Sequence, residues 1–263
     1  MIDELEKPHA LVCNEVRGGN RKFIGTRKLP GIAAWVASIP INVADGGGDL
    51  HFMSVCSRDL ICRIALADVS GHGRAVDAAA VTLHELMRKN IDVWGQSDFM
   101  QELNDTFNRD GGGQYATAIA LGFHWATGRL AFSNAGHLPP LWYHASKRAW
   151  GWLKEGDPAA HEAFGLPVGL IPGTRYRQTV VTLKPSDLLV LYTDGITDAE
   201  NGAGKDLGRE QLLEWAREGP VESPRTLGEQ LLKRLTEFRG NRHNDDETLL
   251  VLQREKESAG YTW

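Results

Sequence analysis

The sequence predicts an α+β fold in which antiparallel sheets are covered by helices. Short apolar runs bounded by Gly, Asp or Ser are typical of strands, and they follow one another in hairpin-connected groups. Between and after these groups, apolar residues recur every three or four positions, which indicates amphipathic helices. Strands in groups favour layered antiparallel sheets over a doubly wound parallel sheet, in which strands and helices alternate.

The first half of the chain is expected to contain three strands and two helices after an N-terminal extension. Residues 1–30 mix Gly, Lys and Arg without periodicity and are expected to pack loosely. The expected strands are 32–39, 51–57 and 60–69, with a hairpin turn at 57–59. The first helix is expected at 75–92, along a stripe that includes Val76, Leu83 and Met87. The second is expected at 98–108, capped by Ser97 or Asp98.

The second half is expected to begin after the glycine run at 111–113. Its expected strands are 115–123, 129–133, 141–143, 150–153, 175–183, 187–192 and 247–253, and its expected helices are 209–217 and 226–239. No long linker interrupts this series, so one domain is expected at 31–254, followed by a short tail at 255–263.

Composition excludes several classes of protein. With 263 residues, 42% of them hydrophobic, the chain can bury a sizeable core. The net charge is −5, and Lys and Arg do not cluster, so no nucleic-acid partner is expected. The apolar runs are too short to span a bilayer and residues 1–8 lack an apolar signal core, so a cytoplasmic protein without membrane contact is expected. Its three cysteines have no metal-binding spacing and are expected to be free thiols.

Four segments place an aspartate where a strand begins or ends beside a turn. They are Gly47-Gly48-Asp49, Ala67-Asp68-Val69-Ser70-Gly71-His72-Gly73, Tyr192-Thr193-Asp194-Gly195 and Asn244-Asp245-Asp246-Glu247. A carboxylate at the end of a buried strand has a fixed position, and neighbouring glycines let backbone and ligand approach closely. Taken alone, an Asp-Gly pair is usually only a turn; what points to a site is that all four occur together.

Gathered at one sheet edge, these carboxylates would repel one another. At about 4 Å, each pair of unit charges costs roughly 4 kcal/mol for an effective dielectric near 20. Hard divalent cations relieve such repulsion, and carboxylate, carbonyl and water oxygens suit Mg²⁺ or Mn²⁺. Two ions about 3.5–4 Å apart can activate a water for attack on phosphorus. The pattern therefore predicts metal-dependent phosphate-ester hydrolysis.

The ordered motifs resemble a known family. They are GGD, ADVSGHG, YAT, SNAGHLPPLWY, GLPVGL, YTDGITDAEN and NDDETLLVL, and they resemble the SpoIIE-like branch of the PPM metal-dependent serine/threonine phosphatases. The resemblance runs from about residue 46 to 253. It implies an α-β-β-α sandwich, two antiparallel sheets flanked by helices, with two Mn²⁺ or Mg²⁺ ions at one end.

The resemblance also implies a ligand set. Asp49 and Asp68 are expected to be the central ligands, one of them bridging the two ions, and the Val69 carbonyl is expected to bind one ion. Asp194 and Asp245 are expected to hold the other.

Several neighbouring residues are expected to have lesser roles. Asp246 is expected to support the ligands rather than join them. His72 either orients a water or protonates the leaving oxygen, or it fixes its turn by hydrogen bonding. The turn at 134–137 is expected to form a wall of the site, and Thr117 and Thr193 to satisfy buried polar groups near the ligands.

The sequence leaves three functions to compare. The first is a protein serine/threonine phosphatase; the resemblance suggests a phosphorylated STAS-type anti-anti-sigma factor as substrate, and hence sigma factor regulation. The second is a pseudophosphatase that binds a phosphoprotein or an anti-sigma kinase without turnover, although all four ligand acids are present. The third is hydrolysis of a small phosphate ester or nucleotide, for which no P-loop or Rossmann glycine pattern is visible.

Overall fold

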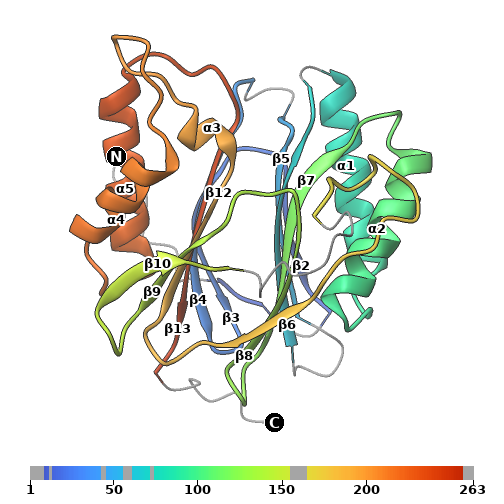
Figure 1. Ribbon diagram of the computed structural model, residues 1–263, viewed down its shortest axis with the longest axis horizontal. Coiled ribbons are helices and arrows are strands. Elements are labelled where there is room, and N and C mark those ends of the chain that lie inside the picture. Colours follow the sequence, from blue (N-terminus) through green and yellow to red (C-terminus); the bar gives the residue numbers. More distant parts are fainter. Residues whose placement is uncertain are drawn as a thin grey trace.

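The computed structural model describes residues 9–11, 14–42, 46–55, 61–71, 74–154 and 165–256. Two β-sheets face each other, and helices cover the outer face of each (Figure 1). Neighbouring strands pair antiparallel except β1 and β3, which are parallel. The predicted α-β-β-α sandwich is therefore confirmed.

The first sheet has seven strands. In spatial order they are β1 (His9–Ala10), β3 (Phe23–Leu29), β4 (Ile32–Ile39), β13 (Glu247–Arg254), β12 (Leu188–Tyr192), β9 (Leu141–His144) and β10 (Ala149–Trp152).

The second sheet has six strands. In spatial order they are β11 (Thr179–Thr182), β8 (Arg129–Ala135), β7 (Ala116–His124), β6 (Ile61–Val69), β5 (Asp49–Val55) and β2 (Val16–Gly19).

Two long helices cover each sheet (Figure 1). Helices α1 (Arg74–Lys89) and α2 (Gln96–Asp110) lie on the second sheet, and α4 (Arg209–Glu218) and α5 (Pro224–Arg239) lie on the first. A single turn, α3 (Asp194–Thr197), follows directly after β12. None of the described helices is both long and apolar enough to cross a membrane.

The apolar residues form three layers of core. One cluster fills the space between the sheets, a second lies under α1 and α2, and a third lies under α4 and α5. Strands β5 and β12 are buried on both faces, which explains why β12 reads as a continuous apolar run rather than as an alternating pattern. This packing fixes the strand ends, from which the aspartates of interest project.

The N-terminal region differs from expectation. Loose packing was wrong for residues 14–29, because β2 pairs with β5 and β3 pairs along its whole length with β4. Leu11 and Leu29 are fully buried in the core between the sheets. Strand β3 reads Phe-Ile-Gly-Thr-Arg-Lys-Leu, and its order comes from this pairing rather than from an apolar period.

Smaller corrections concern element ends. Only 179–182 of the strand expected at 175–183 pairs with a neighbour. Helix α2 begins at Gln96 after Gly95, without a side-chain cap, so neither Ser97 nor Asp98 caps it. The hairpin turn expected at 57–59 lies outside the described residues.

Candidate metal centre

Asp49 and Asp68 lie directly opposite each other at one end of the second sheet. Asp49 is the first residue of β5 and pairs in register with Asp68 near the end of β6. Directly opposed residues point to the same face with Cβ atoms about 4.5–5.5 Å apart, and like charges in such a pair are destabilising. Asp49 is buried and Asp68 half-buried, so water screens this repulsion only in part.

Thr193 connects this end of the second sheet to the first sheet. Its hydroxyl donates to the Asp49 carboxylate over 2.6 Å and accepts from the Thr248 backbone N–H over 3.0 Å. Thr193 is the residue between β12 and α3, so the next residue, Asp194, lies at the same end of the sandwich. As expected from the sequence, Thr193 satisfies a buried polar group beside the aspartates.

Gly195 brings the turn after β12 against the loop before β13. A Cβ atom on Gly195 would lie 2.0 Å from the Asp246 carbonyl oxygen, so a side chain here is excluded. The Asp-Gly pair therefore has a packing reason: it lets Asp194 and Asp245 lie on two segments in direct contact.

The adjacent acids Asp245 and Asp246 have different surroundings. One Asp246 oxygen accepts from the Ile41 backbone N–H over 2.8 Å, and the other accepts from the Gly48 N–H over 2.6 Å. Asp246 thus anchors the segment that leads into β5. Asp245 is exposed and accepts from the Asp246 N–H over 2.8 Å. This difference supports Asp245 as the ligand and Asp246 as its support.

The Val69 backbone is in close contact with Gly48. Val69 donates its N–H to the Gly48 carbonyl over 3.2 Å, and a Cβ on Gly48 would lie 2.8 Å from the Val69 carbonyl oxygen. Glycine at 48 therefore leaves the Val69 carbonyl uncrowded beside Asp49. His72, the expected acid or water-orienting residue, lies outside the described residues.

Charges on aspartates from all four segments affect one another's pKa values. Burial, followed by the charges of Asp194, Asp245 and Asp246, raises the pKa of Asp68 to about 7. Burial and the Asp68 charge also raise the pKa of Asp49 well above its ordinary value. For Asp194 the direction is again upward, from burial and then the charge of Asp245. Asp194 and Asp245 are exposed, so solvent weakens their part of the repulsion.

The donor set fits hard cations in its chemistry. All the candidate ligands are oxygen atoms, which is the preference of Mg²⁺ and Mn²⁺. Among the described residues, no three His, Cys, Asp or Glu side chains already lie close enough to form a ligand cage. Positive charge between the carboxylates would offset their mutual repulsion.

The turn at 134–137 forms a wall beside Asp68. The Asn134 amide donates to the His137 carbonyl over 2.9 Å, and the His137 N–H donates to the Asn134 side-chain oxygen over 2.7 Å. The His137 ring lies 3.0 Å from the hydroxyl of Thr117, which pairs with Asp68 across β6 and β7. Burial lowers the pKa of His137 to about 4, so the ring is neutral at pH 7.

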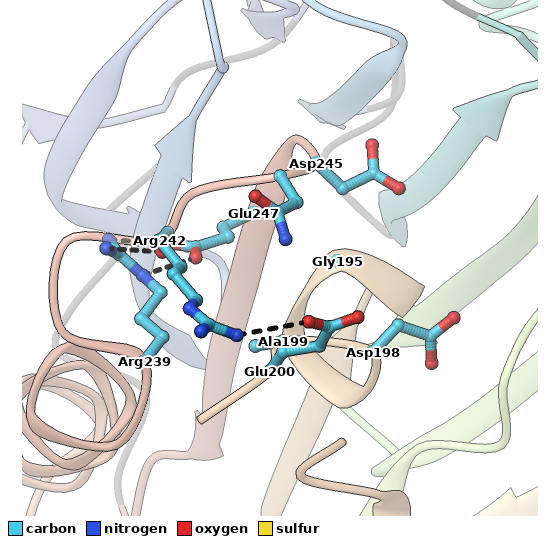
Figure 2. A pocket seen from close by; sticks show the side chains of 9 residues that line it. Gly195, Asp198, Ala199, Glu200, Arg239, Arg242, Asp245 and Glu247 are labelled. Carbon is cyan, nitrogen blue, oxygen red and sulfur yellow. Dashed lines mark hydrogen bonds and ion pairs between the residues drawn. The ribbon is translucent and has the colours of Figure 1, made fainter. Parts of the chain in front are cut away.

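Sequence reasoning missed Asp198. This acid lies one turn after Asp194 and donates its backbone N–H to the Asp194 carbonyl over 2.7 Å. Burial is the main cause of the raised pKa of Asp194 and of Asp245, and the charge of Asp198 adds to both shifts. Asp198 and Asp245 line one small pocket (Figure 2). The spacing of four residues after Asp194, on a helical turn, was the available signal.

Comparisons with known proteins agree with this fold. The family model described as Stage II sporulation protein E (SpoIIE) matches residues 61–255. The phosphoserine phosphatase RsbP of Bacillus subtilis is 25% identical over 72% of this chain, and the chain spans only 44% of RsbP. The phosphoserine phosphatase RsbU of the same organism is 24% identical over 88% of this chain and 67% of its own length.

A solved structure shows the same fold. The RsbU and RsbW domains of a Mycobacterium tuberculosis protein superpose with a TM-score of 0.71 at 22% identity, covering 86% of this chain and 61% of that one. At this identity, the likeness supports the fold of the chain and not its activity.

Proposed function

The chain belongs to the SpoIIE family, and on that premise we propose that it is a metal-dependent phosphatase that removes phosphate from a phosphoserine or phosphothreonine on another protein. The observation that carries this proposal is the convergence of acids from four strand ends. Asp49 and Asp68 oppose each other on one sheet, and the Thr193 hydroxyl bonds Asp49 to the other sheet, next to Asp194.

We assign the ligands from this arrangement. Asp49, Asp68 and the Val69 carbonyl would hold one Mn²⁺ or Mg²⁺ ion, and Asp194 and Asp245 would complete the site of a second. When bound, two such ions supply positive charge to the transferred phosphate and lower the pKa of an attacking water.

The chain's own groups set the geometry for this chemistry. Thr193 orients the Asp49 carboxylate by its 2.6 Å hydrogen bond, and Asp246 holds the approach to β5 through Ile41 and Gly48. Fixed dipoles and charges of this kind need no rearrangement during the reaction, which is the main source of electrostatic catalysis. His72 is proposed either to protonate the leaving oxygen or to orient the water.

The proposed substrate class follows from the family and its named relatives. RsbP and RsbU are phosphoserine phosphatases. We propose that this chain acts on a phosphorylated protein of the STAS-type anti-anti-sigma class in the cytoplasm, and so regulates a sigma factor.

Phosphate release tests the proposal. The purified chain is incubated in excess Mn²⁺ with a phosphoserine-bearing STAS protein and, separately, with p-nitrophenyl phosphate. We expect release from the phosphoprotein that EDTA abolishes and either Mn²⁺ or Mg²⁺ restores. A full rate in metal-free buffer would contradict the mechanism. Binding of the phosphoprotein without any release would instead favour a pseudophosphatase.

A further inference from the structure

Arg239 holds the loop that carries Asp245 and Asp246. It is the last residue of α5, and its Nη1 donates to the carbonyls of Gly240 and Arg242 over 3.0 and 3.1 Å. Its Nε lies 2.6 Å from Glu247 Oε1, and its Nη2 donates to Glu247 Oε2 over 3.3 Å. One guanidinium therefore connects the end of a helix, the loop, and the first residue of β13.

The pair formed by Arg239 and Glu247 is shielded from solvent. The Glu247 side chain is 2% exposed and that of Arg239 is 14% exposed. A buried ion pair loses so much hydration that it often adds little to stability compared with apolar residues of similar volume. What this pair supplies is a fixed geometry, because a planar guanidinium bonds in set directions.

Arg242 extends the connection to the neighbouring segment. From the middle of the same loop, its guanidinium lies 3.4 Å from Glu200 and donates to the Gly202 carbonyl over 3.5 Å. Glu200 belongs to the segment that follows α3, the turn that begins with Asp194. In Figure 2, Arg242 points toward Glu200 and Arg239 toward Glu247, while Asp198 and Asp245 lie to the right in the same view.

The two segments joined in this way carry acids that repel one another. Asp194, Asp198 and Asp245 lie on them, and their like charges favour separation. The contacts of Arg242 with Glu200 and Gly202 oppose that separation, and Arg239 holds the loop from which Arg242 projects.

We propose that Arg239 and Arg242, with Glu247 and Glu200, form an arginine clasp that positions Asp194 and Asp245 for a shared metal ion. This inference rests on the proposed function and deepens it. Both arginines are positioning residues, because they act through the loop and do not touch the ion. Residues that orient metal ligands typically change metal affinity about 10- to 100-fold when they are replaced.

Mn²⁺ binding to the full chain, followed by electron paramagnetic resonance and calorimetry, tests the clasp without reference to turnover. Arg239→Lys keeps the charge but loses the fork of donors. We expect the affinity for one of the two ions to fall about tenfold and that for the other to stay unchanged. The kcat should recover at saturating Mn²⁺. Arg242→Ala should give a smaller loss, because its contacts are longer and exposed.

Asp187→Asn is the matched control. Asp187 is a buried acid beside Arg254, at the opposite end of β13, about 23 Å from Glu247 at 3.3 Å per strand residue. This change should lower the melting temperature and leave both Mn²⁺ affinities unchanged, which separates positioning from general loss of stability.

The outcomes are distinct. Wild-type affinities in Arg239→Lys overturn the clasp, and so does an equal loss in Asp187→Asn. If Arg239→Lys does not fold, Arg242→Ala and Glu200→Gln decide, and unchanged affinities in both overturn it. A wild-type chain that binds no Mn²⁺ contradicts the proposed function instead.

Discussion

Each end of the sandwich contains a buried aspartate, and the two differ in how their charge is compensated. At one end, Asp187 accepts from the indole N–H of Trp142 over 3.2 Å and from the backbone N–H groups of Ala145 and Lys184, each over 2.9 Å. At the other end, Asp49 is almost as buried, but it faces Asp68, whose pKa burial and neighbouring acids raise to about 7.

This difference distinguishes Asp187, an acid with a structural role, from Asp49, an acid that we propose binds a metal ion. Three donors compensate the charge of Asp187 within the chain. The charge of Asp49 is compensated in part, by the Thr193 hydroxyl, and is opposed by a like charge across the strand pair. Burial alone therefore does not mark a site; the balance between donors and neighbouring like charges does.

The largest expected difference between the two ends is in catalysis. Asp68→Asn or Asp194→Asn removes a negative ligand with almost no change of shape. We expect kcat to fall at least about a hundredfold, the scale for one positioned electrostatic group, in a protein whose circular dichroism is unchanged. Steady-state kinetics in Mn²⁺ measure the loss. A loss below about threefold in both variants would remove these acids from the ligand set.

The next largest effect is a difference in kcat between variants of the adjacent acids Asp245 and Asp246. Asp245→Asn should reduce kcat more than Asp246→Asn, because Asp246 uses its oxygens to hold the Ile41 and Gly48 N–H groups. The same kinetics on both variants measure the ratio. If Asp246→Asn is the more damaging, the two assignments are reversed.

The smallest effect on activity is expected at the opposite end. Asp187→Asn replaces one carboxylate oxygen by an NH2 group, which cannot accept a hydrogen bond, and so leaves a buried donor without a partner. Urea unfolding should show a loss of about 1–3 kcal/mol in the free energy of unfolding, with kcat unchanged. A tenfold fall in kcat would show that the two ends are coupled, and the contrast between them would no longer hold.

Periodicity predicted most of the fold. Strand β4 was predicted with its observed bounds, and α5 and β13 to within two residues, because long apolar periods carry the signal. Strand β3 was missed because Gly25, Thr26 and Arg27 give it no such period; it is ordered by its pairing with β4.

The sequence predicted the candidate ligands of the site, but not the contacts that hold them in place. Motif order pointed to Asp49, Asp68, Asp194 and Asp245. The sequence does not show that Asp246 bonds Ile41, 205 positions away, or that Arg239 reaches Glu247 across a loop. Such contacts depend on how segments meet in space, and no local pattern encodes them.

The central claim is that the four acids converge to bind metal, and a thermal-shift series tests it most directly. The raised pKa means that Asp68 binds its proton more tightly in the folded than in the unfolded chain. The metal-free protein therefore loses stability as the pH rises from about 4 to about 7, and at pH 8 the repulsion is fully present.

The series compares wild type and Asp68→Asn at pH 8, each with and without Mn²⁺. Free Mn²⁺ at about 100 times Kd should stabilise wild type by roughly 2.7 kcal/mol, which raises its melting temperature by several degrees. Asp68→Asn should raise the melting temperature of the metal-free protein and reduce the gain from Mn²⁺. Equal melting temperatures in all four samples would mean that the acids do not converge, and would contradict the account.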